Sequence, residues 1–142
     1  MTKKVLLVED NEGDIKLIEE AISDNNLFIE LELLKDGGQA LNYLEDKVNN
    51  SYSDLPDLII MDLNLPKVQG KELLKVYKTD DTIKKIPIII LTTSSLNADI
   101  DECFSYGANA YLIKPIDIIK FFDMMTIIDK FWLRTSCLPE IN

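Results

Sequence analysis

Side chains that can bind or accept a phosphoryl group follow four separate apolar runs of the chain. The runs cover residues 5–8 (VLLV), 58–61 (LIIM), 88–91 (IIIL) and 110–113 (AYLI), and they lead into Glu9 and Asp10, Asp62, Thr92 and Lys114, respectively. Short runs rich in Val, Ile and Leu are typical of strands buried on both faces of a parallel sheet. Because ligands bind outside the carboxyl ends of such strands, we expect these polar groups to meet at one edge. Together they are typical of a Mg²⁺-dependent phosphoryl acceptor.

The acidic residues supply the expected nucleophile and metal ligands. Asp62 could form an aspartyl phosphate, although for this residue alone a structural role in the turn after the strand is equally plausible. Glu9 and Asp10 would add a second pair of carboxylates, and three acids repel one another unless a divalent cation lies between them. Mg²⁺ suits such a site, because it takes few protein carboxylates and completes its coordination with waters and phosphate oxygens.

The hydroxyl and the ammonium group would bind the phosphoryl oxygens. Thr92 could donate a hydrogen bond to one oxygen, and Lys114 could neutralise another as a compact point charge. Each also has an ordinary structural explanation, since Thr is common in strands and Lys-Pro is common in turns. Their joint occurrence at the ends of successive strands favours the phosphoryl site.

The composition excludes several other functions. A chain of 142 residues with 46% hydrophobic and 28% charged residues is typical of one globular domain. A net charge of −10 argues against nucleic-acid binding, which needs a basic surface. The sequence contains no histidine, which excludes a Ser-His-Asp or Cys-His nucleophile and a phosphohistidine of its own. A phosphoryl group must therefore come from another molecule.

Nothing in the sequence predicts export or membrane insertion. No apolar stretch approaches the ~20 residues that a membrane-spanning helix needs. The N-terminus reaches acidic residues after four apolar ones, unlike a secretory signal. Cys103 and Cys137 lack metal-ligand spacing and are predicted to be free thiols. We expect a cytoplasmic protein.

The sequence predicts five strands that alternate with five helices. The expected strands are 5–8, 28–34, 58–61, 88–91 and 110–113. The expected helices are 11–25, a short one around 40–44, 70–79, 99–106 and 117–131. Asn11 is the expected N-cap of the first helix, and a turn at 36–38 precedes the second. Residues 49–56 are a predicted surface loop, and Ile100, Cys103 and Phe104 are expected to face inward. Right-handed crossovers then give an α/β, flavodoxin-like doubly wound (βα)5 fold with a parallel sheet of strand order 2-1-3-4-5.

Four motifs make the chain resemble the receiver domains of response regulators in bacterial two-component signalling. They are VLLVEDN (5–11), LIIMDLNLP (58–66) with Gly70 after it, IPIIILTT (86–93) and GANAYLIKP (107–115). The intervals between Asp62, Thr92 and Lys114 also fit that family, and the resemblance covers about residues 4–131. It implies a signalling protein rather than an enzyme, with only self-catalysed phosphoryl transfer and dephosphorylation.

The resemblance also assigns roles to individual residues. It implies that a partner histidine kinase phosphorylates Asp62. It implies that Asp10, Asp62 and the backbone carbonyl of Asn64 hold Mg²⁺, with Glu9 helping directly or through water.

Three further residues receive roles in phosphoryl binding and switching. Lys114 would pair with the phosphoryl group, Thr92 would be the switch hydroxyl, and Tyr111 matches the aromatic switch position. Phosphorylation would move Thr92 towards the new oxygens and let Tyr111 turn inward, which changes protein contacts.

Two alternatives belong to other functional classes. A haloacid-dehalogenase-like phosphatase also uses an Asp nucleophile, Mg²⁺, Thr or Ser and Lys, but its Asp-x-Asp motif lies on an early strand. Here Asn64 takes the place of the second Asp, the motif is on the third strand, and there is no cap insertion. A constitutive interaction module would be expected to lack the acceptor or the lysine, and neither is missing.

The longer segment before the third strand and the C-terminal extension at 132–142 suggest a subfamily. With EDNEGDIKLIEEA (9–21) and MDLNLPKVQGKELL (61–74), they resemble single-domain regulators that serve phytochrome-type histidine kinases. We expect one receiver domain over residues 1–142 without an output domain. Its effect would then come from protein contacts or from passing the phosphoryl group on in a phosphorelay.

The last helix predicts a protein partner. Apolar residues cover an arc about twice the ~100° stripe of an ordinary amphipathic helix, so one apolar side remains after packing on the sheet. We predict a homodimer through this helix and the adjoining face of the fourth helix. The alternative is that residues 134–142 fold back and cover that side. Asp129 interrupts the arc, which suggests local fraying or an ion pair across an interface.

Overall fold

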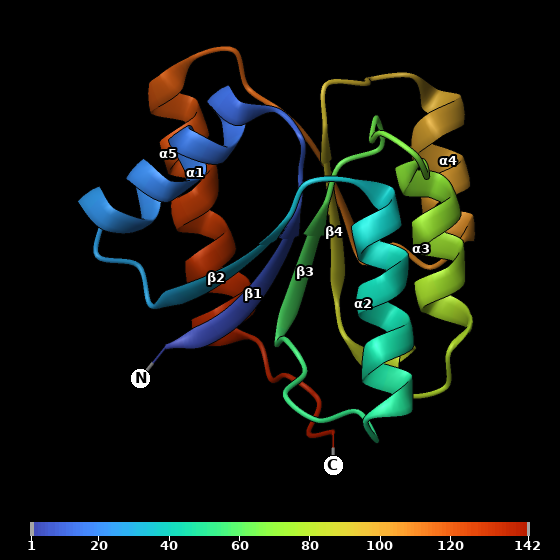
Figure 1. Cartoon of the computed structure of the whole chain (residues 1–142). Coiled ribbons are helices and arrows are strands. Elements are labelled where there is room, and N and C mark those ends of the chain that lie inside the picture. Colours follow the sequence, from blue (N-terminus) through green and yellow to red (C-terminus); the bar gives the residue numbers. More distant parts are fainter. Residues whose placement is uncertain (1, 142) are drawn as a thin grey trace.

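The computed structural model describes residues 2–141, in which a five-stranded parallel sheet lies between two layers of helices (Figure 1). The strands are β1 (Lys3–Val8), β2 (Ile29–Leu34), β3 (Leu58–Met61), β4 (Ile88–Thr92) and β5 (Ala110–Ile113), in the order β2-β1-β3-β4-β5. One layer is formed by α1 (Glu12–Asp24) and α5 (Ile118–Ile128), and the other by α2 (Gly37–Asn49), α3 (Gly70–Thr79) and α4 (Asn97–Ser105). The predicted flavodoxin-like doubly wound fold is confirmed.

Two apolar cores explain why the central strands are almost continuously apolar. Successive side chains of a strand point to opposite faces, so Leu6 and Ile59 pack under α2, α3 and α4, whereas Leu7 and Ile60 pack under α1 and α5. Every residue of β3 and β4 is buried. No helix within residues 2–141 has both the length and the apolar character needed to cross a lipid bilayer.

The strand register brings the carboxyl ends of the central strands to one edge. Val8 of β1 lies beside Met61 of β3, and the Asp62 N–H donates to the Val8 carbonyl at 3.0 Å. Thr92 of β4 lies beside Ile113 of β5, so the residues after these strands emerge side by side. This register is the reason that groups distant in sequence share one site.

Helix α2 is longer than predicted. The sequence suggested a turn at 36–38 and a short helix, but Asp36 caps the helix by accepting a 2.8 Å hydrogen bond from the Gln39 N–H. The helix then runs from Gly37 to Asn49, and the predicted surface loop at 49–56 follows directly after it. The two glycines belong to the first turn of the helix rather than to a separate turn, and Gly37 allows close contact with the Val68 carbonyl.

Helix α4 shows a second difference. Cys103 is buried and Ile100 is partly buried as predicted, but Phe104 is 49% exposed. The helix is only nine residues long and presents a narrow side to the sheet, so the position next to Cys103 turns outward. Phe104 is therefore a surface residue of this layer.

The end of the chain corrects three expectations about the last helix. The α-helix ends at Ile128 and continues as a π-helical turn, η2 (Asp129–Thr135), beyond the predicted end at 131. Asp129 is neither frayed nor exposed for an interface, because it is buried in this turn. Its Oδ2 atom accepts a 2.7 Å bond from Arg134 of the same chain.

The tail after η2 lies along the amino ends of the strands, near the N-terminus (Figure 1). Leu138 packs against the core under α1 and α5, and Ile141 against the core under α2, α3 and α4. The alternative that the tail covers the apolar side of α5 is therefore wrong, since Ile119, Ile127 and Phe131 remain more than half exposed.

Candidate functional site

Three of the predicted acidic residues come together at the carboxyl edge of the sheet. Glu9 and Asp10 follow β1, and Asp62 follows β3. One carboxylate oxygen of each lies within 4.8 Å of the others. Glu9 and Asp62 are buried, whereas Asp10 is exposed, so the cluster opens to solvent on one side.

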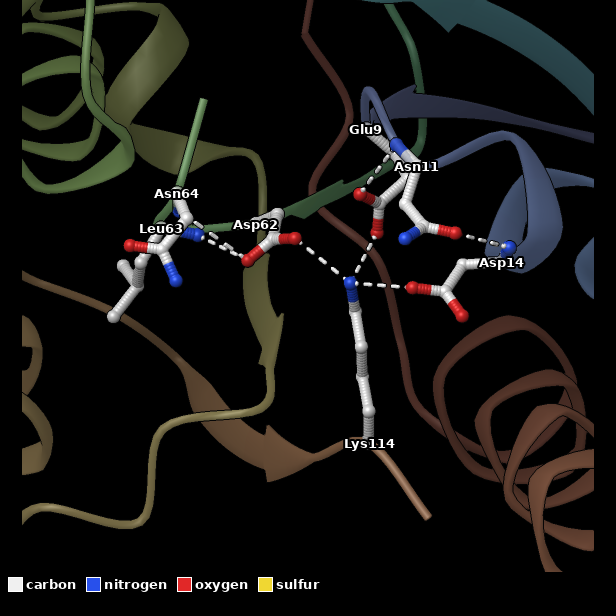
Figure 2. A network of polar contacts seen from close by, with 7 residues as sticks. All are labelled: Glu9, Asn11, Asp14, Asp62, Leu63, Asn64 and Lys114. Atoms are coloured by element: carbon white, nitrogen blue, oxygen red, sulfur yellow. Dashed lines mark hydrogen bonds and ion pairs between the residues drawn. The ribbon is translucent and has the colours of Figure 1, made fainter. Parts of the chain in front are cut away.

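Lys114 reaches into this cluster from the end of β5. Its Nζ atom lies 2.7 Å from Glu9 Oε1, 2.7 Å from Asp62 Oδ2 and 2.8 Å from Asp14 Oδ2. Figure 2 shows the ammonium group between the three carboxylates. Since an ammonium group has three hydrogens, each carboxylate can receive one.

Burial and charge shift the pKa values of these groups in different directions. Burial raises the pKa of Glu9 to about 7, and Lys114 only partly offsets this effect. Burial also opposes ionisation of Asp62, but its hydrogen bond with Lys114 and the lysine charge outweigh this, so the pKa of Asp62 is lowered. Burial alone would lower the pKa of Lys114, but its three carboxylate partners raise it. Asp62 is therefore an ionised carboxylate, as a nucleophile must be.

The loop after β3 holds the Asp62 side chain from its other side. Asp62 Oδ1 accepts hydrogen bonds from the backbone N–H groups of Leu63, at 2.6 Å, and Asn64, at 3.4 Å. Gly70 closes the loop by donating to the Leu63 carbonyl, and a Cβ atom there would lie 2.0 Å from the Asp62 carbonyl oxygen. A residue without a side chain is therefore required at the start of α3.

Thr92 and Tyr111 lie on the neighbouring strands. Thr92 is fully buried at the end of β4, and its Oγ1 atom has no hydrogen-bond partner within residues 2–141. Tyr111 of β5 is half-buried, and its hydroxyl donates to the Ser94 carbonyl at 2.9 Å. Tyr111 thus contacts the loop that begins directly after Thr92.

Two features of the site were missed in the sequence. Asp14 was predicted only as part of a loop and helix start, whereas its carboxylate, in the first turn of α1 after the Asn11 cap, contacts Lys114. The second feature connects α3 to α4, where Asp99 binds both the Ser94 hydroxyl and Lys71 at 2.5 Å. No sequence signal links Asp14 to Lys114 or Lys71 to Asp99, because each pair joins segments that are distant in the sequence.

The residues present fit a Mg²⁺ ion. The converging oxygens of Glu9, Asp10 and Asp62 are hard anionic donors, and the exposed side of the cluster leaves room for water ligands. The unpartnered Oγ1 atom of Thr92 adds an independent sign of a missing group, because buried hydroxyls normally have a hydrogen-bond partner. A phosphoryl oxygen would be such a partner.

Comparison with known proteins gives the same interpretation. The response regulator receiver domain family matches residues 5–126. Response regulator Rcp1 of Synechocystis is 37% identical over 137 residues, which are 96% of this chain and 93% of Rcp1. The structure of its Mn²⁺-bound form has a TM-score of 0.87, with 97% of this chain and 99% of that chain covered.

Two further solved structures are similar. The phosphorylated cyanobacterial phytochrome response regulator RcpA is 38% identical, with a TM-score of 0.89 and coverage of 99% of this chain and 100% of RcpA. The receiver domain of the sensor histidine kinase PA1611 from Pseudomonas aeruginosa has a magnesium ion in its active-site cleft. It is 27% identical, with a TM-score of 0.70 and coverage of 94% and 98%.

These relatives give no support to the haloacid-dehalogenase alternative, since the family match extends over most of the chain and the relatives are receivers and response regulators. The parallel sheet, the acidic cluster that fits Mg²⁺ and the relatives lead to one conclusion. This chain belongs to the response regulator receiver family and is a signalling protein of the two-component type.

Proposed function

We propose that Asp62 is the residue that accepts the phosphoryl group, and that a histidine kinase donates it. The observation that carries this proposal is the position of Asp62, a buried, ionised carboxylate that contacts Lys114 and forms one cluster with Glu9 and Asp10. Glu9, Asp10 and Asp62 would hold Mg²⁺ together with the backbone carbonyl of Asn64. The bound ion would neutralise part of the negative charge that the incoming phosphoryl group meets.

The remaining side chains bind and orient the phosphoryl group. As the Asp62 carboxylate forms its bond to phosphorus, the bond to the donor breaks and its electrons leave with the donor atom. The Lys114 ammonium, 2.7 Å from Asp62 Oδ2, is placed to bind a phosphoryl oxygen. The free Thr92 hydroxyl can bind another. We infer no catalytic activity beyond this self-catalysed transfer and the later hydrolysis of the acyl phosphate.

Mass spectrometry after incubation with acetyl phosphate tests the acceptor. Wild type should gain one phosphoryl group when Mg²⁺ is present and none when a chelator removes it, whereas Asp62→Asn should gain none. Asp57→Asn is a matched control, because Asp57 precedes the same strand at the opposite edge of the sheet. Equal labelling of Asp62→Asn and wild type would exclude Asp62.

We further propose that Thr92 and Tyr111 transmit the change. Thr92 would move towards the phosphoryl oxygens, and Tyr111 would follow because its hydroxyl bonds to Ser94 in the same loop. Thr92→Val should accept phosphate yet lose the phosphorylation-dependent change in affinity for a partner. An unchanged affinity shift in that variant would separate Thr92 from the switch.

The partner kinase is proposed to be of the phytochrome type. The similarity to RcpA, a phytochrome response regulator, supports this proposal. We expect the complex in the cytoplasm, with a phosphorelay protein or another protein as the target. Transfer from candidate kinases to purified chain, compared at equal concentrations, tests the pairing. Faster transfer from unrelated kinases than from phytochrome-type ones would contradict it.

The chain is also proposed to form a homodimer through α5 and the adjoining face of α4. Exposed apolar side chains support this, since the tail leaves them uncovered; they are Leu96, Phe104, Ile113, Ile116, Ile119, Ile127 and Phe131. In a two-fold symmetric dimer both subunits contribute the same surface, so the exposed apolar side chains of each subunit would be covered by the other subunit.

Sedimentation velocity at micromolar concentrations tests the dimer. Phe131→Glu should weaken it, whereas Val48→Glu, which places the same charge at an exposed apolar position of α2, should not. A wild-type monomer both with and without phosphorylation would exclude the dimer.

A further inference from the structure

A fourth carboxylate lies at the rim of the acceptor site. Asp14 belongs to the first turn of α1, and its Oδ2 atom contacts Lys114 Nζ at 2.8 Å. Its side chain is 23% exposed, whereas those of Glu9 and Asp62 are 1% and 7% exposed. Asp14 is therefore the most exposed of the three carboxylates that contact Lys114, and it lies on the other side of the ammonium group from Asp62 (Figure 2).

The shared contact with Lys114 fixes how close Asp14 is to the acceptor. Asp14 Oδ2 and Asp62 Oδ2 both lie within 2.8 Å of the same nitrogen, so they are no more than about 5–6 Å apart. Asp14 also takes up one of the three ammonium hydrogens. It thereby adds a negative charge beside the acceptor and reduces the positive charge that Lys114 offers to an anion.

We propose that Asp14 selects the phosphoryl donor by charge. Its carboxylate disfavours acyl phosphates, whose leaving group is an anion, relative to phosphoramidates, whose leaving nitrogen departs as a neutral group. A phosphohistidine belongs to the second class. This inference rests on the proposed function of Asp62 as the acceptor, and it names the class of donor that the site prefers.

The two classes of donor differ in the charge that appears near Asp14. In phosphoramidate the phosphorus–nitrogen bond breaks as the bond to Asp62 forms, and the protonated nitrogen takes the electron pair and leaves as ammonia. A phosphohistidine protonated on its other ring nitrogen likewise leaves as neutral imidazole. In acetyl phosphate the phosphorus–oxygen bond breaks and acetate leaves with a negative charge, which the Asp14 carboxylate repels.

Rates of phosphorylation by acetyl phosphate and by phosphoramidate, measured at saturating Mg²⁺, test the proposal. Asp14→Asn should raise the acetyl phosphate rate relative to the phosphoramidate rate by about fivefold, the effect of one unit charge at about 5–6 Å in a largely aqueous rim. High salt should shrink this difference. Asp14→Glu should restore the wild-type ratio.

Glu12→Gln is the matched control. Glu12 lies in the same first turn of α1, but it pairs with Lys35 at 2.9 Å and its side chain is 74% exposed. The helix cap remains in both variants, because Asn11 accepts its bond from the backbone N–H of Asp14. Should Asp14→Asn fold poorly, Asp14→Ser removes the same charge, and it should give the same change in ratio.

Calorimetric titration with Mg²⁺ alone gives a readout without phosphoryl transfer. Asp14→Asn should bind Mg²⁺ about threefold more weakly, because the ammonium beside the metal ligands is then less neutralised. Glu12→Gln should bind as wild type does. A change in donor ratio without weaker Mg²⁺ binding would overturn the electrostatic explanation.

The outcomes separate this inference from the function on which it rests. Labelling of Asp62→Asn by either donor would reject Asp62 as the acceptor. If wild type is labelled at Asp62, but Asp14→Asn changes the donor ratio by less than twofold or in the opposite direction, only the role of Asp14 is rejected. A larger ratio change that is accompanied by weaker Mg²⁺ binding, absent in Glu12→Gln and reversed in Asp14→Glu, supports it.

Discussion

Ionisation of the buried Glu9 carboxylate should destabilise the metal-free protein as the pH rises. Its pKa is raised from 4.5 to about 7 in the folded state, mainly by burial. Between these values the folded chain holds a proton that the unfolded chain has lost, so the free energy of unfolding falls with increasing pH. The stabilisation is complete below about pH 4.5 and is lost as the pH passes through about 7.

The size of this effect follows from the shift. Each pKa unit corresponds to about 1.4 kcal/mol, so the full loss is about 3 kcal/mol. That is a substantial part of the ~5–15 kcal/mol by which a typical domain is stable. Glu9→Gln stays neutral at every pH, so it should match wild type near pH 4.5 and exceed it by up to about 3 kcal/mol at pH 8.

Urea denaturation in the presence of a chelator measures this difference at both pH values. Asp10→Asn is a suitable control, because Asp10 belongs to the same cluster but is exposed. Adding Mg²⁺ at pH 8 should reverse the order, since the ion binds the wild-type carboxylate better than the amide. A difference between Glu9→Gln and wild type that is the same at pH 4.5 and pH 8 would refute this reasoning.

Two further predictions concern stability. Gly70→Ala should lower the free energy of unfolding by at least about 2 kcal/mol, since its Cβ would lie 2.0 Å from the Asp62 carbonyl oxygen. The control Gly38→Ala should have a smaller effect, because a Cβ there meets only side-chain atoms at 3.1 Å or more. Equal urea midpoints for the two variants would contradict this prediction. Tyr77→Phe should cost about 1–3 kcal/mol in the same assay, because the Ala40 carbonyl loses a buried 2.6 Å hydrogen bond, and no loss would mean that water replaces it.

The fold was predictable because its signals are local. Buried parallel strands need nearly continuous apolar runs, and each run here is followed by polar residues that cannot continue the core. Strand order then brings Glu9, Asp62 and Lys114 to one edge. The sequence alone could therefore place these groups near one another, although it gave no distances.

What could not be predicted depends on contacts between distant segments. The pairing of Asp14 with Lys114 requires the first turn of α1 to face the end of β5, which is decided by how α1 packs. The end of α5 was missed for a similar reason. Helical periodicity continues through residue 131, whereas the wider π-helical turn depends on burying Asp129 with Arg134.

The C-terminal tail acts as a brace between the two helical layers. Leu138 packs against the core on one side of the sheet and Ile141 against the core on the other, and both are partly buried, so one short segment contacts both layers at the edge opposite the acceptor site. Rearrangements at the carboxyl edge therefore take place while the tail holds the opposite, amino-terminal edge of the sheet. Loss of the tail would loosen both layers at once, including α2 and α3, which are distant from the last helix in the sequence.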